Sequence, residues 1–241
     1  SASACRPLLN TSDEVAGLFM RLASTTHLQP RVLSSSPWVL QLDAASTPNE
    51  TAAMVRDSGP FSASSVNTPS NGWQTTRWRK SEEFHCFSDA RSCATRSGIQ
   101  AFFARLHSTL GLPRSHADTV SVLKYSPGGY YRKHHDFLSR TSQPRLWGRR
   151  GPRQLTMMLY LSSASQEADG GATRFFTRQG APPTIAVQPR AGRALLWSNV
   201  RLENPLAREE RTFHEAALLR SGLKLVATTW IHAFDGRRWC L

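Results

Sequence analysis

Two histidines and one aspartate in this sequence are of the residue types that bind transition metals. His134 and Asp136 lie two residues apart, and His214 follows much later in the chain. Two imidazoles and one carboxylate can hold non-heme Fe(II) on one face and leave the remaining coordination positions open. Lys224 lies ten residues after His214 and adds a cation that suits a carboxylate. Together these residues predict an oxygenase that uses a 2-oxo acid.

The segment that carries His134 and Asp136 has the character of a β-strand. It is rich in aromatic residues and follows a Pro-Gly-Gly turn. Because side chains alternate between the two faces of a strand, His134 and Asp136 share one face and His135 points away. Tyr131 has the opposite parity to Asp136, so alternation alone does not place it in the site. The alternative interpretation is an accidental polar pair on a solvated edge.

Size and charge limit the classes of protein that fit. A chain of 241 residues with 39% hydrophobic and 20% charged residues is long enough for one large domain with a buried core. No apolar run has the length needed to span a bilayer, and no cleavable signal pattern is visible. The net charge of +13 favours acidic partners. Neither a basic recognition helix nor an aromatic stacking sheet is evident, so we find no clear nucleic-acid motif.

Part of the positive charge is concentrated in one segment around Trp147. Its arginines are Arg140, Arg145, Arg149, Arg150 and Arg153. One interpretation is a basic, mobile flap over an active site. The other is a solvated loop without a partner, which is at least as reasonable for each arginine taken individually.

The four cysteines do not have the spacing of a zinc site. Their even number fits two disulfides, Cys86–Cys93 and Cys5–Cys240, in an oxidising compartment. Four unrelated thiols are the alternative. Two Asn-x-Ser/Thr sequons, at Asn10 and Asn49, favour the endoplasmic reticulum or secretory pathway.

Hydrophobic periodicity divides the chain into a helical first half and a strand-rich second half. Capping residues and apolar spacing predict helices over 10–27, 48–57 and 98–110, with a strand over 32–44 and a loop over 62–71. Strands are expected over 119–125, 130–137, 155–162, 173–176, 185–188, 194–197, 212–219 and 223–233. We therefore predict an α+β fold: a jelly roll flanked by N-terminal supporting helices. The expected single domain, 1–241, comprises an N-terminal helical extension (1–30), a helical support region (31–117) and the jelly-roll core (118–235).

Several phrases after residue 119 occur in an order and spacing typical of one enzyme family. They are Tyr125-x-x-Gly-Gly-x-Tyr131-x-x-His134-x-Asp136, then Gly170-Gly-Ala-Thr-Arg-Phe175, Gly192-Arg-Ala-Leu-Leu-Trp197, His214-Glu-Ala-Ala, Gly222-Leu-Lys224 and Ala227-Thr-Thr-Trp230. Residues 119–235 resemble the catalytic domain of the prolyl 4-hydroxylases, the Fe(II)- and 2-oxoglutarate-dependent oxygenases of the collagen and algal or plant cell-wall type. The fold that this resemblance implies is a double-stranded β-helix, which is a cupin-like jelly roll.

The resemblance also implies a role for each matching residue. His134, Asp136 and His214 would hold the iron, and Lys224 would pair with the distal carboxylate of 2-oxoglutarate. Other branches of the superfamily, among them the oxygen-sensing prolyl hydroxylases, use arginine there, so the lysine favours the collagen and cell-wall branch. Residues expected to line the cosubstrate pocket are Tyr125, Tyr131, Tyr160, Thr173, Thr228 and Trp230. Arg153 and Trp147 are expected to face the peptide substrate.

The implied reaction is hydroxylation of peptidyl proline to 4-hydroxyproline in a proline-rich or collagen-like polypeptide. It would consume O2, convert 2-oxoglutarate to succinate and CO2, and use ascorbate as the reductant. Asp136 favours hydroxylation, because halogenating relatives lack this carboxylate. Phe213 and Leu225 depart from the residues that the family often has at these positions. A hydroxylase of another target, such as a free amino acid or a different side chain, is the first alternative, and an inactive binding module is the second. The sequence does not indicate an oligomeric state.

Overall fold

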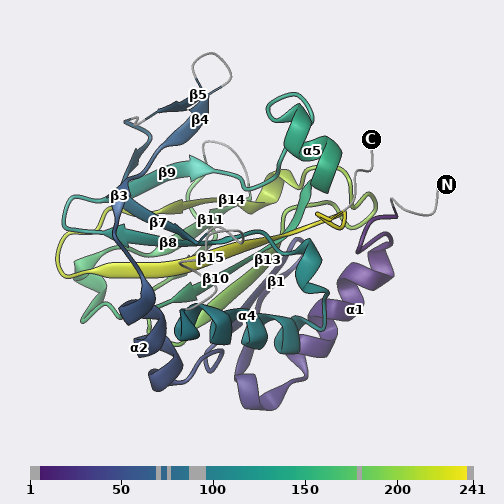
Figure 1. The fold of residues 1–241 in the computed structure, drawn as a ribbon. Helices are drawn as coiled ribbons and strands as arrows, with labels where there is room; N and C mark the ends of the chain where they lie inside the picture. Colours follow the sequence, from purple (N-terminus) through teal and green to yellow (C-terminus); the bar gives the residue numbers. More distant parts are fainter. Residues whose placement is uncertain (1–5, 69–71, 75–76, 87–95, 178–180, 238–241) are drawn as a thin grey trace.

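Two antiparallel sheets face each other in the computed structural model, which describes residues 6–68, 72–74, 77–86, 96–177 and 181–237 (Figure 1). The larger sheet has the order β1 (Pro30–Ser35), β2 (Trp38–Leu42), β13 (Ala194–Ser198), β10 (Arg153–Tyr160), β15 (Lys224–His232), β8 (Val120–Tyr125), β7 (Glu82–Cys86) and β3 (Ser62–Ala63). The smaller sheet has the order β12 (Ile185–Val187), β11 (Thr173–Phe176), β14 (Phe213–Ala216), β9 (Tyr130–His134) and β6 (Arg79–Lys80). A separate hairpin pairs β4 (Val66–Thr68) with β5 (Gly72–Gln74).

Three helices cover the outer face of the larger sheet, at the bottom of Figure 1. They are α1 (Ser12–Ala23), α2 (Pro48–Asp57) and α4 (Ser97–Leu110). A fourth helix, α5 (Pro144–Arg150), stands on the opposite side, above the smaller sheet. Short 3-10 turns occur at η2 (Thr26–Leu28), η3 (Arg114–His116), η4 (Glu167–Asp169) and η5 (Glu210–Thr212).

The helices begin where the sequence provides caps. The side chain of Thr11 accepts a hydrogen bond from the backbone N–H of Glu14, and the Glu14 carboxylate returns to the Thr11 backbone, so that α1 opens with a complete capping box. Thr47 and Glu50 repeat this arrangement at α2. Helix α4 ends at Gly111, whose left-handed conformation is the common C-terminal signal.

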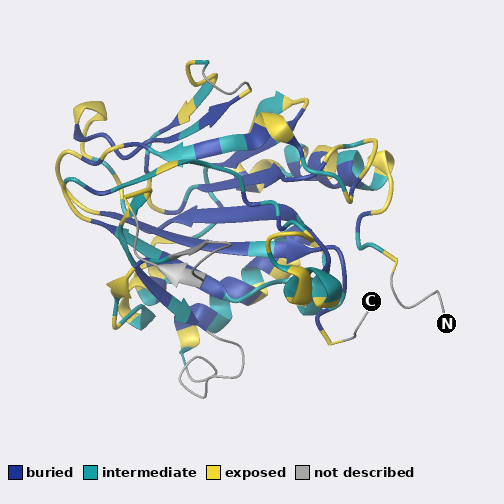
Figure 2. Ribbon diagram, turned by 90° about the horizontal axis from the view of Figure 1, so that it is seen from above, coloured by how far each residue is buried: buried dark blue, intermediate teal, exposed yellow. Residues whose placement is uncertain are grey.

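Apolar side chains form two layers of core. One layer lies between the helices and the larger sheet and contains Phe19, Leu22, Phe102, Leu155 and Leu196. The second lies between the two sheets and includes Tyr160, Phe175 and Trp197. Figure 2 shows the buried residues concentrated on the strands of both sheets. This arrangement confirms the predicted jelly roll with supporting helices.

The region before residue 118 contributes more to the sheets than its description as helical support suggests. It supplies four strands of the larger sheet, β1, β2, β3 and β7, as well as β6 of the smaller one. The single strand expected over 32–44 is wrong, because a turn at Pro37 divides it into the hairpin of β1 and β2. The expected loop over 62–71 contains β3 and β4 within its described part.

Two further expectations concern the cysteines and the membrane. Of the cysteines in the predicted disulfides, Cys93, Cys5 and Cys240 lie outside the described residues, while Cys86 is buried on β7.

In the described part of the chain, none of the helices has both the length and the apolar character needed to cross a bilayer.

Candidate active site

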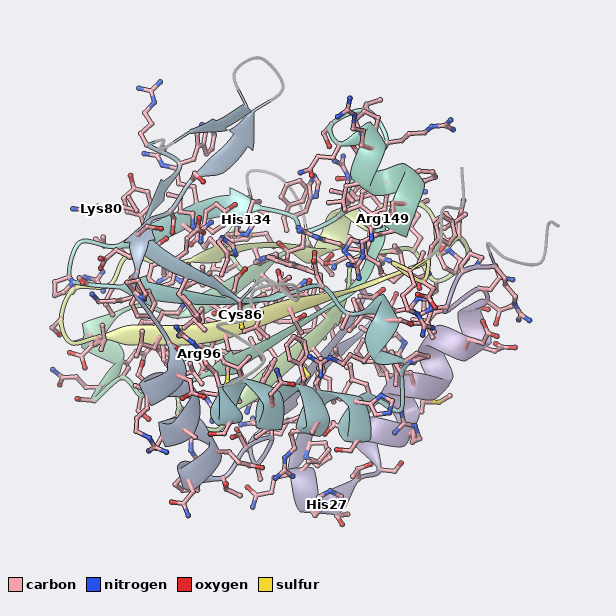
Figure 3. All side chains as sticks on the ribbon, in the orientation of Figure 1. His27, Lys80, Cys86, Arg96, His134 and Arg149 are labelled. Atoms are coloured by element: carbon pink, nitrogen blue, oxygen red, sulfur yellow. The ribbon has the colours of Figure 1, made fainter. Side chains whose placement is uncertain are left out.

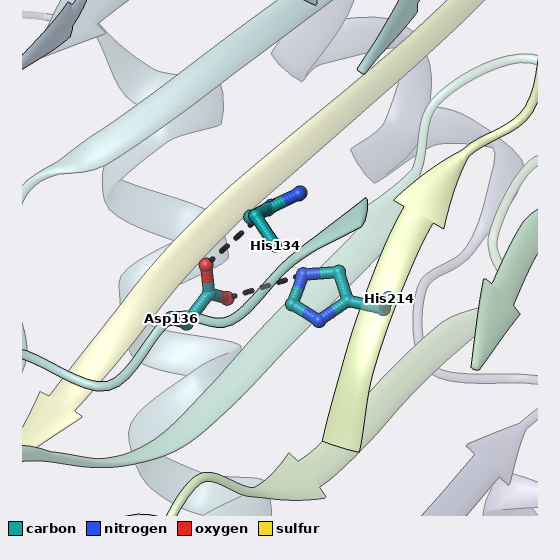
Figure 4. A group of neighbouring side chains, drawn as sticks. All are labelled: His134, Asp136 and His214. Carbon is teal, nitrogen blue, oxygen red and sulfur yellow. Dashed lines mark ion pairs between the residues drawn. The ribbon is translucent and has the colours of Figure 1, made fainter. Parts of the chain in front are cut away.

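His134, Asp136 and His214 come together at one end of the smaller sheet (Figure 4). His134 is the last residue of β9 and pairs directly with His214 on β14, while Asp136 lies just beyond the end of β9. The Nε2 atoms of the histidines are 3.8 and 3.7 Å from the Asp136 oxygens Oδ1 and Oδ2, respectively. One ligand atom from each residue lies within 4.8 Å of the others. Such a cluster has room for one metal ion.

Backbone carbonyls orient both rings. Nδ1 of His134 is 2.8 Å from the carbonyl oxygen of Arg132, and Nδ1 of His214 is 3.0 Å from that of Thr212. A carbonyl oxygen only accepts hydrogen bonds, so each Nδ1 carries the proton and donates it. Each Nε2 is therefore left with its lone pair, as is usual for histidines that bind a metal. The donor set and its tautomers fit Fe(II).

The carboxylate of Asp136 is supported from the larger sheet. The Thr156 hydroxyl donates to Oδ2 at 2.8 Å, and the Asn199 amide donates to the Thr156 oxygen, also at 2.8 Å. Thr156 and Asn199 are almost completely buried. Ligating carboxylates in metalloproteins are usually held by such outer partners.

Electrostatics favour the metal-binding protonation states of His134 and Asp136. Burial lowers the pKa of His134, and the neighbouring His214 lowers it further. Burial opposes ionisation of Asp136, but the facing His214 and His134 outweigh that effect and hold its pKa below the usual range. Neutral imidazoles and an ionised carboxylate are the forms that coordinate metals.

The side chains of His135 and Tyr131, which neighbour His134 in sequence, point in different directions. His135 points away from the triad, where its Nε2 is 2.8 Å from Nη1 of Arg208, as the alternation of side chains predicted. Tyr131, however, stacks on the His134 ring with centroids 3.6 Å apart. Between these positions β9 advances three residues while β14 advances two, from His214 to Ala216. This bulge turns Tyr131 to the same side as His134, which simple alternation does not foresee.

Lys224 is the first residue of β15 and is 1% exposed. Its Nζ donates to the carbonyl oxygen of Gly171 at 2.6 Å and lies 3.5 Å from Oγ1 of Thr173. Among the described residues, Lys224 takes part in none of the ion pairs, and its other neighbours include the Tyr125 and Tyr160 rings. Burial lowers its pKa to about 7. A buried ammonium without a carboxylate partner fits the acid group of a cosubstrate.

One cavity of about 660 Å³ connects the triad with Lys224. Of the residues predicted to contact cosubstrate or substrate, its walls include Tyr125, Tyr131, Arg153, Thr173, Thr228 and Trp230. Two predicted contacts lie elsewhere. Tyr160 is behind the wall, where its hydroxyl donates to Oγ1 of Thr173 at 2.7 Å. Trp147 packs edge-on against Phe234 instead of lining the cavity.

Arg153 is held in the wall by Trp230, which the sequence had indicated, and by Asp118, which it had not. Its guanidinium carbon lies 3.7 Å from the centre of the Trp230 ring, and its Nη2 is 3.6 Å from Oδ2 of Asp118. The same Asp118 oxygen is 3.1 Å from Nε2 of His232. Asp118 just precedes β8 and His232 ends β15, so only the pairing of distant strands brings them together.

The opposite wall carries a second polar group that sequence reasoning missed. Glu83 pairs with Arg79 at 3.0 Å and with Nε2 of His85 at 3.3 Å, and Nδ1 of His85 is 2.8 Å from the Ser121 hydroxyl. The four residues lie on β6, β7 and β8. In the sequence, the alternation of polar Glu83 and His85 with apolar Phe84 was the pattern that could have indicated a strand with polar side chains on one face.

Comparison with known proteins shows what the second half of the chain is similar to. The family profile of the 2OG-Fe(II) oxygenase superfamily matches residues 120–232. The rat prolyl 4-hydroxylase subunit alpha-3 is 32% identical over 133 residues, which are 54% of this chain and 23% of the rat protein. Prolyl 4-hydroxylase 1 of Arabidopsis thaliana is 29% identical over 141 residues, which are 55% of this chain and 47% of that protein. The chain thus spans at most about half the length of these relatives.

Solved structures agree on the fold. A prolyl hydroxylase from Trichoplax adhaerens, in complex with a hypoxia inducible factor peptide fragment, superposes with a TM-score of 0.57 at 16% identity. The alignment covers 94% of this chain and 91% of that one. Enzymes of the matched superfamily use Fe(II), 2-oxoglutarate and O2, and the triad and Lys224 both belong to the region of the sequence match. Residues 120–232 therefore match the 2OG-Fe(II) oxygenase superfamily, and the same part of the chain resembles the prolyl 4-hydroxylases.

Proposed function

We propose that this protein hydroxylates peptidyl proline at C4 and couples this reaction to the decarboxylation of 2-oxoglutarate to succinate and CO2. The observation that carries the proposal is the buried, carboxylate-free ammonium of Lys224 in the same cavity as the triad. The curated relatives are named as prolyl 4-hydroxylases, which supports proline as the target. A proline-rich or collagen-like chain is the substrate we expect.

The protein's own residues bind and orient the reactants. His134, Asp136 and His214 would hold Fe(II), which when bound with 2-oxoglutarate activates O2 for insertion into a C–H bond. Lys224 would bind the distal carboxylate, and this binding would offset the cost of burying its charge. The stacked Tyr131 ring limits movement of the His134 ring.

The cavity is large enough to admit more than the cosubstrate. Its volume of about 660 Å³ falls in the range of small-molecule sites, and it extends from Lys224 to α5 and to the wall of Glu83 and His85. A proline side chain has no hydrogen-bond donor, so the apolar wall of Leu123 and Leu146 suits it.

The test is incubation with Fe(II), 2-oxoglutarate, ascorbate and a panel of proline-containing peptides. Mass spectrometry should detect the gain of one oxygen atom on proline, with one succinate formed for each hydroxylation. Hydroxylation of a free amino acid, or of another side chain only, would replace the proposal with its first alternative. Absence of any succinate from a metal-loaded protein would favour an inactive binding module.

Variants test the assignment of the ligands. His134→Ala and Asp136→Ala should each abolish Fe-dependent succinate formation while the circular dichroism spectrum is unchanged. His135→Ala is the matched control, because this adjacent histidine points to Arg208 and should leave Fe(II) affinity unaltered. Turnover that persisted in either ligand variant would refute the assignment.

We propose further that the enzyme works in the secretory pathway and uses ascorbate as a reductant. Asn10 and Asn49 are both exposed, so their sequons are accessible to glycosylation. The disulfides Cys86–Cys93 and Cys5–Cys240 belong to the same proposal. Peptide mapping of the secreted protein with and without reduction would test the pairing, and glycosidase treatment would test the sequons.

A further inference from the structure

The segment 137–166 is strongly basic and borders the cavity. It contains five arginines, at 140, 145, 149, 150 and 153, and no aspartate or glutamate. Helix α5 lies within it, and Gln143 and Leu146 belong to the cavity wall that also contains His134. Figure 3 shows α5 and Arg149 above the sheets on the same side as His134.

Helix α5 is anchored to the rest of the protein, in a segment for which the sequence left open both a flap and a solvated loop. Nε of Arg149 donates to the carbonyl oxygen of Gly236 at 3.0 Å, and Nη2 of Arg150 donates to that of Ala117 at 2.7 Å. Trp147 packs edge-on against Phe234. The helix is thus a fixed wall of the cavity entrance.

Two arginines beside this wall face solvent, one four residues before α5 and one within it. Arg140 and Arg145 are exposed, and neither takes part in an ion pair with any described residue. The Arg140 guanidinium lies 5.6 Å from the centre of the Trp147 ring. Stacking of this kind leaves the edge of the guanidinium, which carries its N–H donors, available for a carboxylate.

The acidic groups of the cavity wall are already paired. Outside the triad they are Glu83 with Arg79, Asp118 with His232 and Arg153, and Glu215 with Arg174. A basic substrate would find these carboxylates occupied, whereas an acidic one would find Arg140 and Arg145 open. The electrostatic balance of the entrance therefore favours a negatively charged ligand.

Resting on the proposed function, we infer that the enzyme selects peptides that carry aspartate or glutamate within a few residues of the target proline. Arg140, which precedes α5, and Arg145, which lies on α5, contact that acidic side chain beside the cavity entrance. A peptide fits better than a nucleic acid, because single strands need aromatic stacking platforms. Near α5 the described aromatic side chain Trp147 is already packed against Phe234.

Peptide binding tests this inference without turnover. Three labelled peptides of equal length share a central proline and differ only in flanking Glu, Gln or Lys residues. Their Kd values are measured by fluorescence anisotropy with Mn(II) and a 2-oxoglutarate analogue that cannot be decarboxylated. The Glu peptide should bind roughly three- to tenfold more tightly than the Gln peptide at low salt, and the difference should nearly vanish at about 0.5 M salt.

Matched variants test whether the preference for the Glu peptide depends on Arg140 and Arg145. The double variant Arg140→Gln/Arg145→Gln should abolish the preference for Glu, and Arg140→Glu/Arg145→Glu should invert it towards the Lys peptide. Arg31→Gln/Arg56→Gln removes the same charge from exposed sites on β1 and α2, away from the cavity, and should keep the preference.

Three results would overturn the inference. These are equal Kd values for the Glu and Gln peptides, a preference that survives charge reversal at Arg140 and Arg145, or tighter binding of a labelled oligonucleotide through the same two arginines. The proposed function is tested separately by hydroxylation of the Gln peptide. If the Gln peptide is not hydroxylated but the Glu peptide still binds more tightly, the proposed hydroxylation of proline is rejected. The inferred selectivity for acidic peptides would then still stand.

Discussion

The Thr156 hydroxyl donates its single hydrogen to Oδ2 of Asp136, and Asn199 fixes the direction of that bond. Because the Asn199 amide donates to the Thr156 oxygen, the threonine proton has to point towards the carboxylate. Oδ2 is thereby occupied in part, which leaves Oδ1 as the freer ligand atom. This chain of hydrogen bonds links β10 and the residue after β13 of the larger sheet to the candidate metal site.

Removing this support should weaken metal binding. Thr156→Val keeps the shape but loses the hydroxyl, and we expect Fe(II) affinity to fall about 10- to 100-fold. Thr156→Ser should restore most of it. Anaerobic titration followed by ligand-field absorption of a Co(II) substitute measures the effect apart from activity. Unchanged metal affinity in Thr156→Val would show that the hydrogen bond is only structural.

Cosubstrate affinity should depend on pH through Lys224. Its pKa is lowered to about 7, so the ammonium is formed below pH 7 and is progressively lost above it in the free protein. Binding of a carboxylate restores the charged form, so 2-oxoglutarate should bind more weakly as pH rises above 7, by up to about tenfold per pH unit. Calorimetry in buffers of different ionisation enthalpy should detect proton uptake at pH 8. Lys224→Ala should lose both the uptake and most of the affinity.

The same lysine should cost stability when no cosubstrate is bound. Its pKa is about 7 in the folded protein, against 10.5 for an unperturbed lysine, so the penalty is fully present below pH 7 and is relieved as pH rises towards 10.5. Lys224→Met should raise the free energy of unfolding at pH 6 by up to about 5 kcal/mol, since one pKa unit corresponds to roughly 1.4 kcal/mol. Thermal unfolding at pH 6 and pH 9 measures this gain. A gain that did not shrink at the higher pH would contradict the explanation.

Gly171 should be needed for the geometry around Lys224. Its φ of +72° lies in the left-handed region, and an added Cβ would be 2.9 Å from Cδ1 of Leu219. Gly171→Ala should lower the free energy of unfolding by about 1–2 kcal/mol and also weaken 2-oxoglutarate binding, because its carbonyl accepts from Nζ. Gly222 is the control, because its φ is +76° and an added Cβ would have no atom within 4 Å. Gly222→Ala should lose similar stability but keep the affinity for 2-oxoglutarate.

Local patterns were sufficient for features that depend on neighbouring residues. Alternation separated His134 from His135 although β9 ends at His134, and Asp136 still lies with His134 in the cluster. The capping sequences at Thr11 and Thr47 placed the starts of two helices, since such caps act within one turn.

Features that depend on distant strands could not be predicted in this way. The bulge that moves Tyr131 towards His134 appears only when β9 is paired with β14. Tyr160 was expected in the pocket, yet Thr173 on another strand stands between them. Helix α5 has only seven residues and none of them is fully buried, so its sequence has no apolar period to detect.

Lys224 has a further consequence for the architecture, because its side chain crosses between the two layers. It begins on the larger sheet, and its Nζ reaches Gly171 and Thr173 at the start of the smaller one. The length of one lysine therefore matches the gap between the layers. Replacement by arginine, which is longer and ends in a rigid plane, would require the sheets to move apart. The distance between the two sheets therefore favours a lysine over an arginine as the anchor at this position.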